Sequence, residues 1–133
     1  MQRILLVDDH EMARKAMKHF LEHHGYACEE AEHGAAALAK LDQGPSVDLI
    51  VSDNHMPVMI GMELLVQVKA NPHFGSIPFI LYSGNITDEM YQRGHARRTR
   101  LIRRLNIRGS MNGHTMQNTL PHINSAMISN PRQ

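Results

Sequence analysis

Acidic and hydroxyl side chains stand at the ends of three apolar runs of this sequence. The runs and their polar ends are residues 3–7 with Asp8 and Asp9, residues 47–52 with Asp53, and residues 77–82 with Ser83. If these runs are neighbouring parallel strands, their carboxyl ends meet where open α/β sheets place their ligands. Three carboxylates brought together would repel one another unless a cation lies between them. Oxygen ligands without cysteine or paired histidine favour a hard ion, most commonly Mg²⁺.

A divalent cation beside a carboxylate nucleophile is suited to phosphoryl transfer, because it neutralises charge on the phosphoryl oxygens. The hydroxyl of Ser83 could donate a hydrogen bond to one of those oxygens, and Gly84 leaves room for the group to enter. Pro57 stops the strand that ends near Asp53. Asp53 is therefore the first candidate for a nucleophile.

The apolar runs alternate with segments of helical periodicity. Strands are predicted over residues 3–7, 26–30, 47–52 and 77–82, and helices over residues 11–24, 33–41, 61–70 and from Thr87 onward. In the first helix, Met12, Ala16, Phe20 and Leu21 are expected to form the apolar face. Short links between alternating elements predict an α/β fold with a doubly wound parallel sheet and helices on both faces.

Composition limits the class of protein further. The 133 residues suffice for one domain with a hydrophobic core, and they contain no apolar span of membrane length and no signal peptide. The single Cys28 excludes an internal disulfide framework and is expected to be a buried small side chain. We therefore expect a cytoplasmic protein without membrane partners. The pair His19 and His23 could hold a metal, but a solvated helix face is the simpler interpretation.

The motifs resemble a known family. Ile4-Leu5-Leu6-Val7-Asp8-Asp9, Asp53-Asn54-His55-Met56-Pro57 with the later Gly61, and Leu81-Tyr82-Ser83-Gly84 are similar to the receiver domain of two-component response regulators. The resemblance covers about residues 3–92. It implies a flavodoxin-like, five-stranded sheet of order 2-1-3-4-5, whose last strand and helix the sequence defines poorly. It also implies a receiver domain over residues 1–108, followed by an atypical segment 109–133 that forms a weak final helix or a partly disordered tail.

The resemblance implies roles for individual residues. Asp53 would attack the phosphohistidine of a sensor histidine kinase or phosphotransfer protein and become an aspartyl phosphate. Asp9 and Asp53 would ligate Mg²⁺ with the backbone carbonyl of His55, while Asp8 would act mainly through a bound water. Ser83 would move towards the phosphoryl group and report its arrival to a downstream protein partner or a fused output domain. Such a phosphoacceptor catalyses only its own phosphorylation and dephosphorylation, so it is not an enzyme with turnover.

The chain departs from the family pattern after Ser83. In the family, a Lys-Pro pair follows the fifth strand, and an aromatic residue stands three positions before the lysine. The best alignment places Arg103 at the lysine, Arg104 at the proline and Arg100 at the aromatic position. Arg103 keeps the positive charge as a broader planar group, whereas the ring of the switch is lost. A degenerate receiver that binds a partner without a phosphorylation switch is therefore an alternative.

Charge is distributed unevenly along the chain. Residues 1–89 hold 13 acidic and 6 basic residues, and residues 90–133 hold 8 arginines and no acid. A change of reading frame near residue 94 would account for this shift in charge. It would also account for Gly109, Gly113 and Pro121, which are expected to interrupt the last helical segment. The arginines could alternatively form a patch for nucleic acid or an acidic partner. Without a helix-turn-helix pattern or aromatic platform, specific nucleic-acid binding is not expected.

Two other classes fit the sequence less well. Mg²⁺-dependent aspartyl-nucleophile phosphatases that resemble the haloacid dehalogenase family place a second aspartate two residues after the nucleophile, where this chain has His55. A nucleotide-binding domain would need a glycine-rich loop after the first strand, and none follows Val7.

Overall fold

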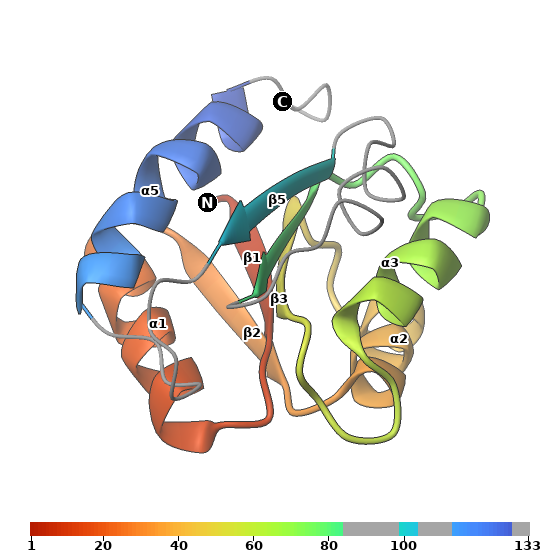
Figure 1. Cartoon of the computed structure of the whole chain (residues 1–133). Coiled ribbons are helices and arrows are strands. Elements are labelled where there is room, and N and C mark those ends of the chain that lie inside the picture. The colour runs from red at the N-terminus through yellow and green to blue at the C-terminus, as the bar shows by residue number, and fades with distance from the viewer. Residues whose placement is uncertain (84–98, 104–112, 129–133) are drawn as a thin grey trace.

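The computed structural model describes residues 1–83, 99–103 and 113–128, and their strands and helices alternate along the chain (Figure 1). The elements are β1 (Arg3–Val7), α1 (Glu11–His23), β2 (Ala27–Ala31), α2 (Gly34–Gln43), β3 (Leu49–Asp53), α3 (Gly61–Ala70), β4 (Phe79–Ser83), β5 (Thr99–Arg103) and α5 (Gly113–Ile128). The helix predicted from Thr87 lies outside the described residues, as do residue 94 and the boundary at residue 108. The same is true of Arg93, Arg97, Arg98, Arg104 and Arg108.

The five strands form one parallel sheet of order β2-β1-β3-β4-β5, which confirms the predicted topology. β3 occupies the centre, and all five of its residues are buried. A parallel strand that is covered on both faces needs a continuous apolar run, which is how this segment reads in the sequence. Because β1 and β3 are neighbours, their carboxyl ends lie side by side at one edge of the sheet.

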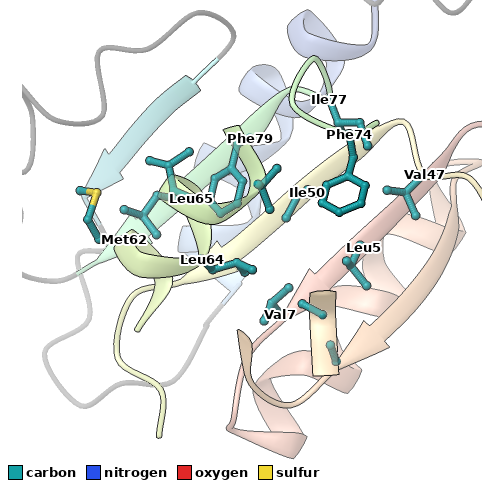
Figure 2. Close-up of a cluster of buried hydrophobic side chains, with 14 of the residues drawn as sticks. Leu5, Val7, Val47, Ile50, Met62, Leu64, Leu65, Phe74, Ile77 and Phe79 are labelled. Atoms are coloured by element: carbon teal, nitrogen blue, oxygen red, sulfur yellow. The ribbon is translucent and has the colours of Figure 1, made fainter. Parts of the chain in front are cut away.

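Helices cover both faces of the sheet, with α1 and α5 on one side and α2 and α3 on the other (Figure 1). The core beneath α2 and α3, drawn in Figure 2, includes Leu5, Val7, Ile50, Leu64, Leu65, Phe74 and Phe79. The core beneath α1 and α5 includes Ile4, Leu6, Met17, Leu21, Val51, Ile80, Ile123 and Met127. Within the described part of the chain, none of the helices has the length and apolar character needed to span a bilayer.

The apolar face predicted for α1 is confirmed at Phe20 and Leu21 but is wrong at Met12 and Ala16. Met12 is 88% exposed and Ala16 is also exposed, while Ala13, Met17 and Leu21 are the buried residues of this helix. The buried set repeats every four residues, which places its members above one another on one helix face. Met12 is one position before Ala13 in the chain, so it lies outside that helix face and points to solvent.

The remaining local predictions depend on backbone chemistry. β4 begins at Phe79 rather than at residue 77, since Pro78 has no N–H with which to enter a ladder. The expected interruption of the last helix at Gly113 and Pro121 is wrong, because α5 begins at Gly113 and continues through Pro121. Its residues Ile123, Ala126 and Met127 are buried in the core that it shares with α1. Cys28 is partly buried in β2, and this burial, with neighbouring acidic charges, raises its thiol pKa to about 12. A thiol with so high a pKa is not a reactive nucleophile at neutral pH.

The corrected phase of α1 gives the first testable prediction. Met17→Ala should lower the free energy of unfolding by about 2–4 kcal/mol, because it leaves a cavity in the core. Met12→Ala should change it by less than about 0.5 kcal/mol, because the side chain is in solvent. Urea denaturation of both variants measures the difference. A loss for Met12→Ala as large as that predicted for Met17→Ala, with little loss for Met17→Ala, would show that α1 packs in the phase first expected from the sequence.

Candidate functional site

The predicted acidic residues converge at the carboxyl edge of the sheet. In the β1–β3 register, Val7 lies opposite Ser52. Asp8 follows Val7 and Asp53 follows Ser52, so the two aspartates stand at neighbouring strand ends. Ligand atoms of Asp8, Asp9, His10 and Asp53 all lie within 4.8 Å of one another. The meeting of the three aspartates was therefore predicted, whereas His10 was not among the predicted site residues.

Two of these aspartates are buried and locally hydrogen-bonded. Asp8 is 1% exposed and Asp53 is 0% exposed, whereas Asp9 is exposed. The backbone N–H of His10 donates to Oδ1 of Asp8 at 2.9 Å, and that of His55 donates to Oδ1 of Asp53 at 3.2 Å. Each buried carboxylate thus accepts a hydrogen bond from the residue two positions later, which compensates part of its lost hydration and fixes its direction.

Tyr82 holds the second oxygen of Asp8. Its hydroxyl donates to Oδ2 of Asp8 at 2.7 Å, and both side chains are buried. A hydrogen bond from a neutral donor to a buried carboxylate is short and strong because the acceptor is charged. Tyr82 also directly precedes Ser83 in β4, so the strand that carries the expected switch residue is bonded to the acidic cluster.

The loop after Asp53 is held by Asn54 and Gly61. Asn54 is nearly buried, and its side-chain Oδ1 accepts from the N–H of Met62 at 2.9 Å, while its backbone oxygen accepts from the N–H of Gly61 at 3.0 Å. Asn54 therefore caps α3, whose own N-cap Ile60 has no side-chain acceptor. A Cβ atom on Gly61 would collide with the backbone oxygen of Asp53, so only glycine allows this close approach.

Arg14 braces the turn between β1 and α1. Its Nη1 donates to the backbone oxygen of Asp8 at 2.7 Å, and its Nε donates to Glu30 at 2.9 Å. Lys15 and Lys18 also pair with Glu30, at 2.9 Å and 3.4 Å. Burial alone would raise the pKa of Glu30, but hydrogen bonds from Lys15 and Arg14 and the surrounding positive charge outweigh it and bring the pKa to about 2.

The other predicted site residues are placed by the backbone. Ser83 ends β4 and Arg103 ends β5, and the parallel register pairs these two residues directly. His55 is exposed and follows Asn54 in the loop. The proposed roles of Ser83, Arg103 and the His55 carbonyl stay predictions.

A hollow of about 450 Å³ lies elsewhere in the described part of the molecule. Val47 and Ile77, which precede β3 and β4, line it together with Asp42 and His73. It is therefore at the amino ends of the strands, the opposite edge from the acidic cluster, and we do not assign it to the same site.

The fold and the acidic cluster define a class of protein. The chain belongs to the response regulator receiver domain family, whose model matches residues 4–99, and the family resemblance of the sequence motifs is thereby confirmed. It is a CheY-like receiver domain by both sequence and architecture.

Particular relatives support the assignment. Chemotaxis protein CheY1 of Helicobacter pylori strain J99 is 38% identical over 80 residues, which cover 59% of this chain and 64% of that protein. The gliding motility regulatory protein of Myxococcus xanthus is 36% identical over 92 residues, which are 69% of this chain and 12% of that protein. The matched regions thus span less than two thirds of these relatives.

Solved structures agree with the sequence comparison. Chemotaxis protein CheY4 of Vibrio cholerae superposes with a TM-score of 0.77 at 31% identity, over 92% of this chain and 98% of that one. The receiver domain of a signal transduction histidine kinase from Syntrophus aciditrophicus gives a TM-score of 0.82 at 25% identity, over 100% of this chain and 95% of that one.

Loss of the Asn54 cap should destabilise the protein. Asn54→Ala leaves the N–H of Met62 without its acceptor and should lower the free energy of unfolding by about 1–2 kcal/mol. Asn71→Ala is the matched control, because Oδ1 of Asn71 accepts only from an exposed N–H, that of His73. Urea denaturation should show a clearly smaller loss for the control, and equal losses would contradict the capping role of Asn54.

The Glu30 cluster should make stability depend on pH. The pKa of Glu30 is about 2 in the folded protein, which is below the value of a free carboxyl group. The ion pairs of Glu30 therefore stabilise the fold above about pH 4.5. This contribution should be lost as the pH falls from about 4.5 to 2. Relative to Glu30→Gln, the unmodified chain should be more stable by about 1 kcal/mol at pH 7, since partly exposed pairs are screened.

Urea denaturation at pH 7, 5 and 3 measures this difference. Glu29→Gln, on the next residue of β2, serves as the control for removal of one negative charge. A difference between the unmodified chain and Glu30→Gln that stays constant down to pH 3 would contradict the assigned pKa.

Proposed function

We propose that this receiver domain accepts a phosphoryl group on Asp53 from the phosphohistidine of a sensor histidine kinase or phosphotransfer protein in the cytoplasm. The observation that carries the proposal is the cluster itself. Asp53 is buried at the end of the central strand, and the carboxylates of Asp8 and Asp9 lie within 4.8 Å of it. A carboxylate nucleophile beside two further acids is suited to binding a cation and a phosphoryl group together.

The transfer step uses the Asp53 carboxylate as nucleophile. One of its oxygens attacks phosphorus, the P–N bond breaks, and the electron pair returns to the imidazole nitrogen of the donor, which then takes up a proton. The product is a mixed anhydride on Asp53. The hydrogen bond from the N–H of His55 to Oδ1 holds this carboxylate in one orientation for the attack. The domain catalyses only its own phosphorylation and the later hydrolysis.

The donor set fits a hard divalent cation. Carboxylates of Asp9 and Asp53, with the backbone carbonyl of His55, would hold Mg²⁺, and Asp8 would contact it through a water. Asp8 is suited to that indirect role, because both of its oxygens already accept hydrogen bonds from His10 and Tyr82. When bound, the cation supplies positive charge to the phosphoryl oxygens.

Ser83 and Arg103 would complete the response to phosphorylation. We propose that the Ser83 hydroxyl and the Arg103 guanidinium contact phosphoryl oxygens, and that the change passes to a downstream protein partner or fused output domain. Their pairing in the β4–β5 register supports this proposal, because Ser83 ends the strand that pairs with the strand of Asp53, and Arg103 lies opposite Ser83 at the end of the next strand. A phosphorylation-independent binding module is the second candidate, and Arg103 and Arg100 favour it where the family pattern has a lysine and an aromatic residue.

Phosphorylation by a small donor tests the proposal. Incubation with Mg²⁺ and acetyl phosphate should add one phosphoryl group, stable to acid and labile to base, as measured by intact-mass spectrometry. Asp53→Asn should reduce the labelling at least tenfold, since the amide is not a nucleophile. Asp42→Asn should leave it unchanged, because Asp42 is exposed at the opposite edge of the sheet.

Two results would overturn the proposal. Equal labelling of the Asp53→Asn variant would place the nucleophile elsewhere. Failure of the folded, unmodified chain to label at all would favour the binding module without a phosphorylation switch.

A further inference from the structure

His10 is a nitrogen ligand among the carboxylates of the site. Its Nδ1 lies 3.3 Å from Oδ1 of Asp8 and 3.2 Å from Oδ1 of Asp9. The imidazole is about half exposed, at 45%, so an ion from solvent can reach it. Asp53 closes the group, since ligand atoms of all four residues lie within 4.8 Å of one another.

The spacing of these atoms is that of ligands on one ion. Two ligands at right angles around an octahedral cation with bonds of about 2.1 Å are about 3 Å apart, and opposite ligands are about 4.2 Å apart. The separation of 3.2 Å between Nδ1 of His10 and Oδ1 of Asp9 is close to the first value, while the 3.3 Å contact between His10 and Oδ1 of Asp8 is a hydrogen bond. Only small side-chain adjustments would bring His10, Asp9 and Asp53 onto a common ion.

Helix capping does not account for the His10 side chain. His10 is the N-cap residue of α1, but its side chain makes no capping hydrogen bond to the helix. Its backbone N–H is held by Asp8, whose other oxygen is held by Tyr82. The backbone is thus fixed while the ring faces the acids instead of the helix end.

We propose that His10 gives this site a direct imidazole ligand and thereby shifts its preference from Mg²⁺ towards Co²⁺, Ni²⁺ and Zn²⁺. Mg²⁺ binds oxygen ligands and gains little from imidazole, whereas the later first-row ions bind imidazole well. Two carboxylates with one imidazole form a mixed donor set that suits these ions. The inference rests on the cation site of the proposed function and assigns that site its metal preference.

Direct metal binding tests the role of His10 without any phosphodonor. Co²⁺ is titrated into the full chain and followed by its visible absorption, and Mg²⁺ is measured by competition with Co²⁺. All variants are made in a His19→Gln, His23→Gln background, because that pair one helical turn apart on α1 could bind Co²⁺ independently. Circular dichroism checks that each variant is folded.

His10→Asn should raise the Kd for Co²⁺ at least about tenfold and change the Kd for Mg²⁺ by less than about threefold. His10→Ala should raise the Kd for Co²⁺ by a similar factor. Because alanine does not cap helices as asparagine does, agreement between the two variants assigns the effect to loss of the nitrogen ligand. His73→Asn is the matched control. This exposed histidine lies beside the hollow at the opposite edge of the sheet and outside the four-residue cluster, so its variant should keep the Co²⁺ affinity.

The outcomes separate the inference from the function on which it rests. If both His10 variants keep the Co²⁺ affinity, or lose Co²⁺ and Mg²⁺ affinity equally while Asp53→Asn weakens both ions, the role of His10 is overturned and the cation site stands. If Asp53→Asn leaves the binding of both ions unchanged, the cation site itself is wrong, and the proposed function fails with it.

Discussion

The structure depends on two carboxylates that are removed from water at neighbouring strand ends. Asp8 and Asp53 are almost completely buried, and the β1–β3 pairing leaves them no way to move apart. A buried charge is tolerated only when hydrogen bonds or a counter-charge replace its hydration. The backbone N–H groups of His10 and His55 and the hydroxyl of Tyr82 provide hydrogen bonds, and Asp9 and His10 are the exposed members of the cluster.

The surrounding segments keep this edge of the sheet in place. Arg14 bonds the backbone oxygen of Asp8 and ties it, through Glu30, to the end of β2. Asn54 joins the end of β3 to the start of α3, where Gly61 lies against the backbone of Asp53. Each of these braces comes from a residue within eight positions of Asp8 or Asp53 or from the neighbouring strand.

Much of this arrangement could be predicted from the sequence. Alternating apolar runs and helical segments predict a parallel sheet, and the resemblance to the receiver family supplies the strand order that brings Asp8, Asp9 and Asp53 together. The buried face of α1 was predicted wrongly at Met12 and Ala16, because its few apolar residues fit more than one helical face and only packing selects Met17 over Met12.

The contact between Tyr82 and Asp8 could not be predicted, because it joins residues that are 74 positions apart. Asn54 and Arg14 bond residues only 8 and 6 positions away, but these contacts depend on the conformation of the turns between them. His10 was closer to being found, since it directly follows Asp8 and Asp9. A histidine in the turn after two acids at a strand end has few places for its ring other than solvent or the acids themselves. Its position relative to Asp53, however, follows only from the β1–β3 pairing.

Tyr82 links the acidic cluster to the strand that would report phosphorylation. Its hydroxyl bonds Asp8, while its backbone oxygen accepts from the N–H of Asn54 at 3.2 Å. The end of β4 is thus attached to both β1 and β3 at the same point. A shift of Ser83 towards a phosphoryl group on Asp53 would have to strain or break one of these bonds, since packed cores and strong hydrogen bonds deform in steps instead of continuously. The hydrogen bond between Tyr82 and Asp8 would also act in the opposite direction. An ion that repositions Asp8 would act through this bond on Tyr82, the residue before Ser83.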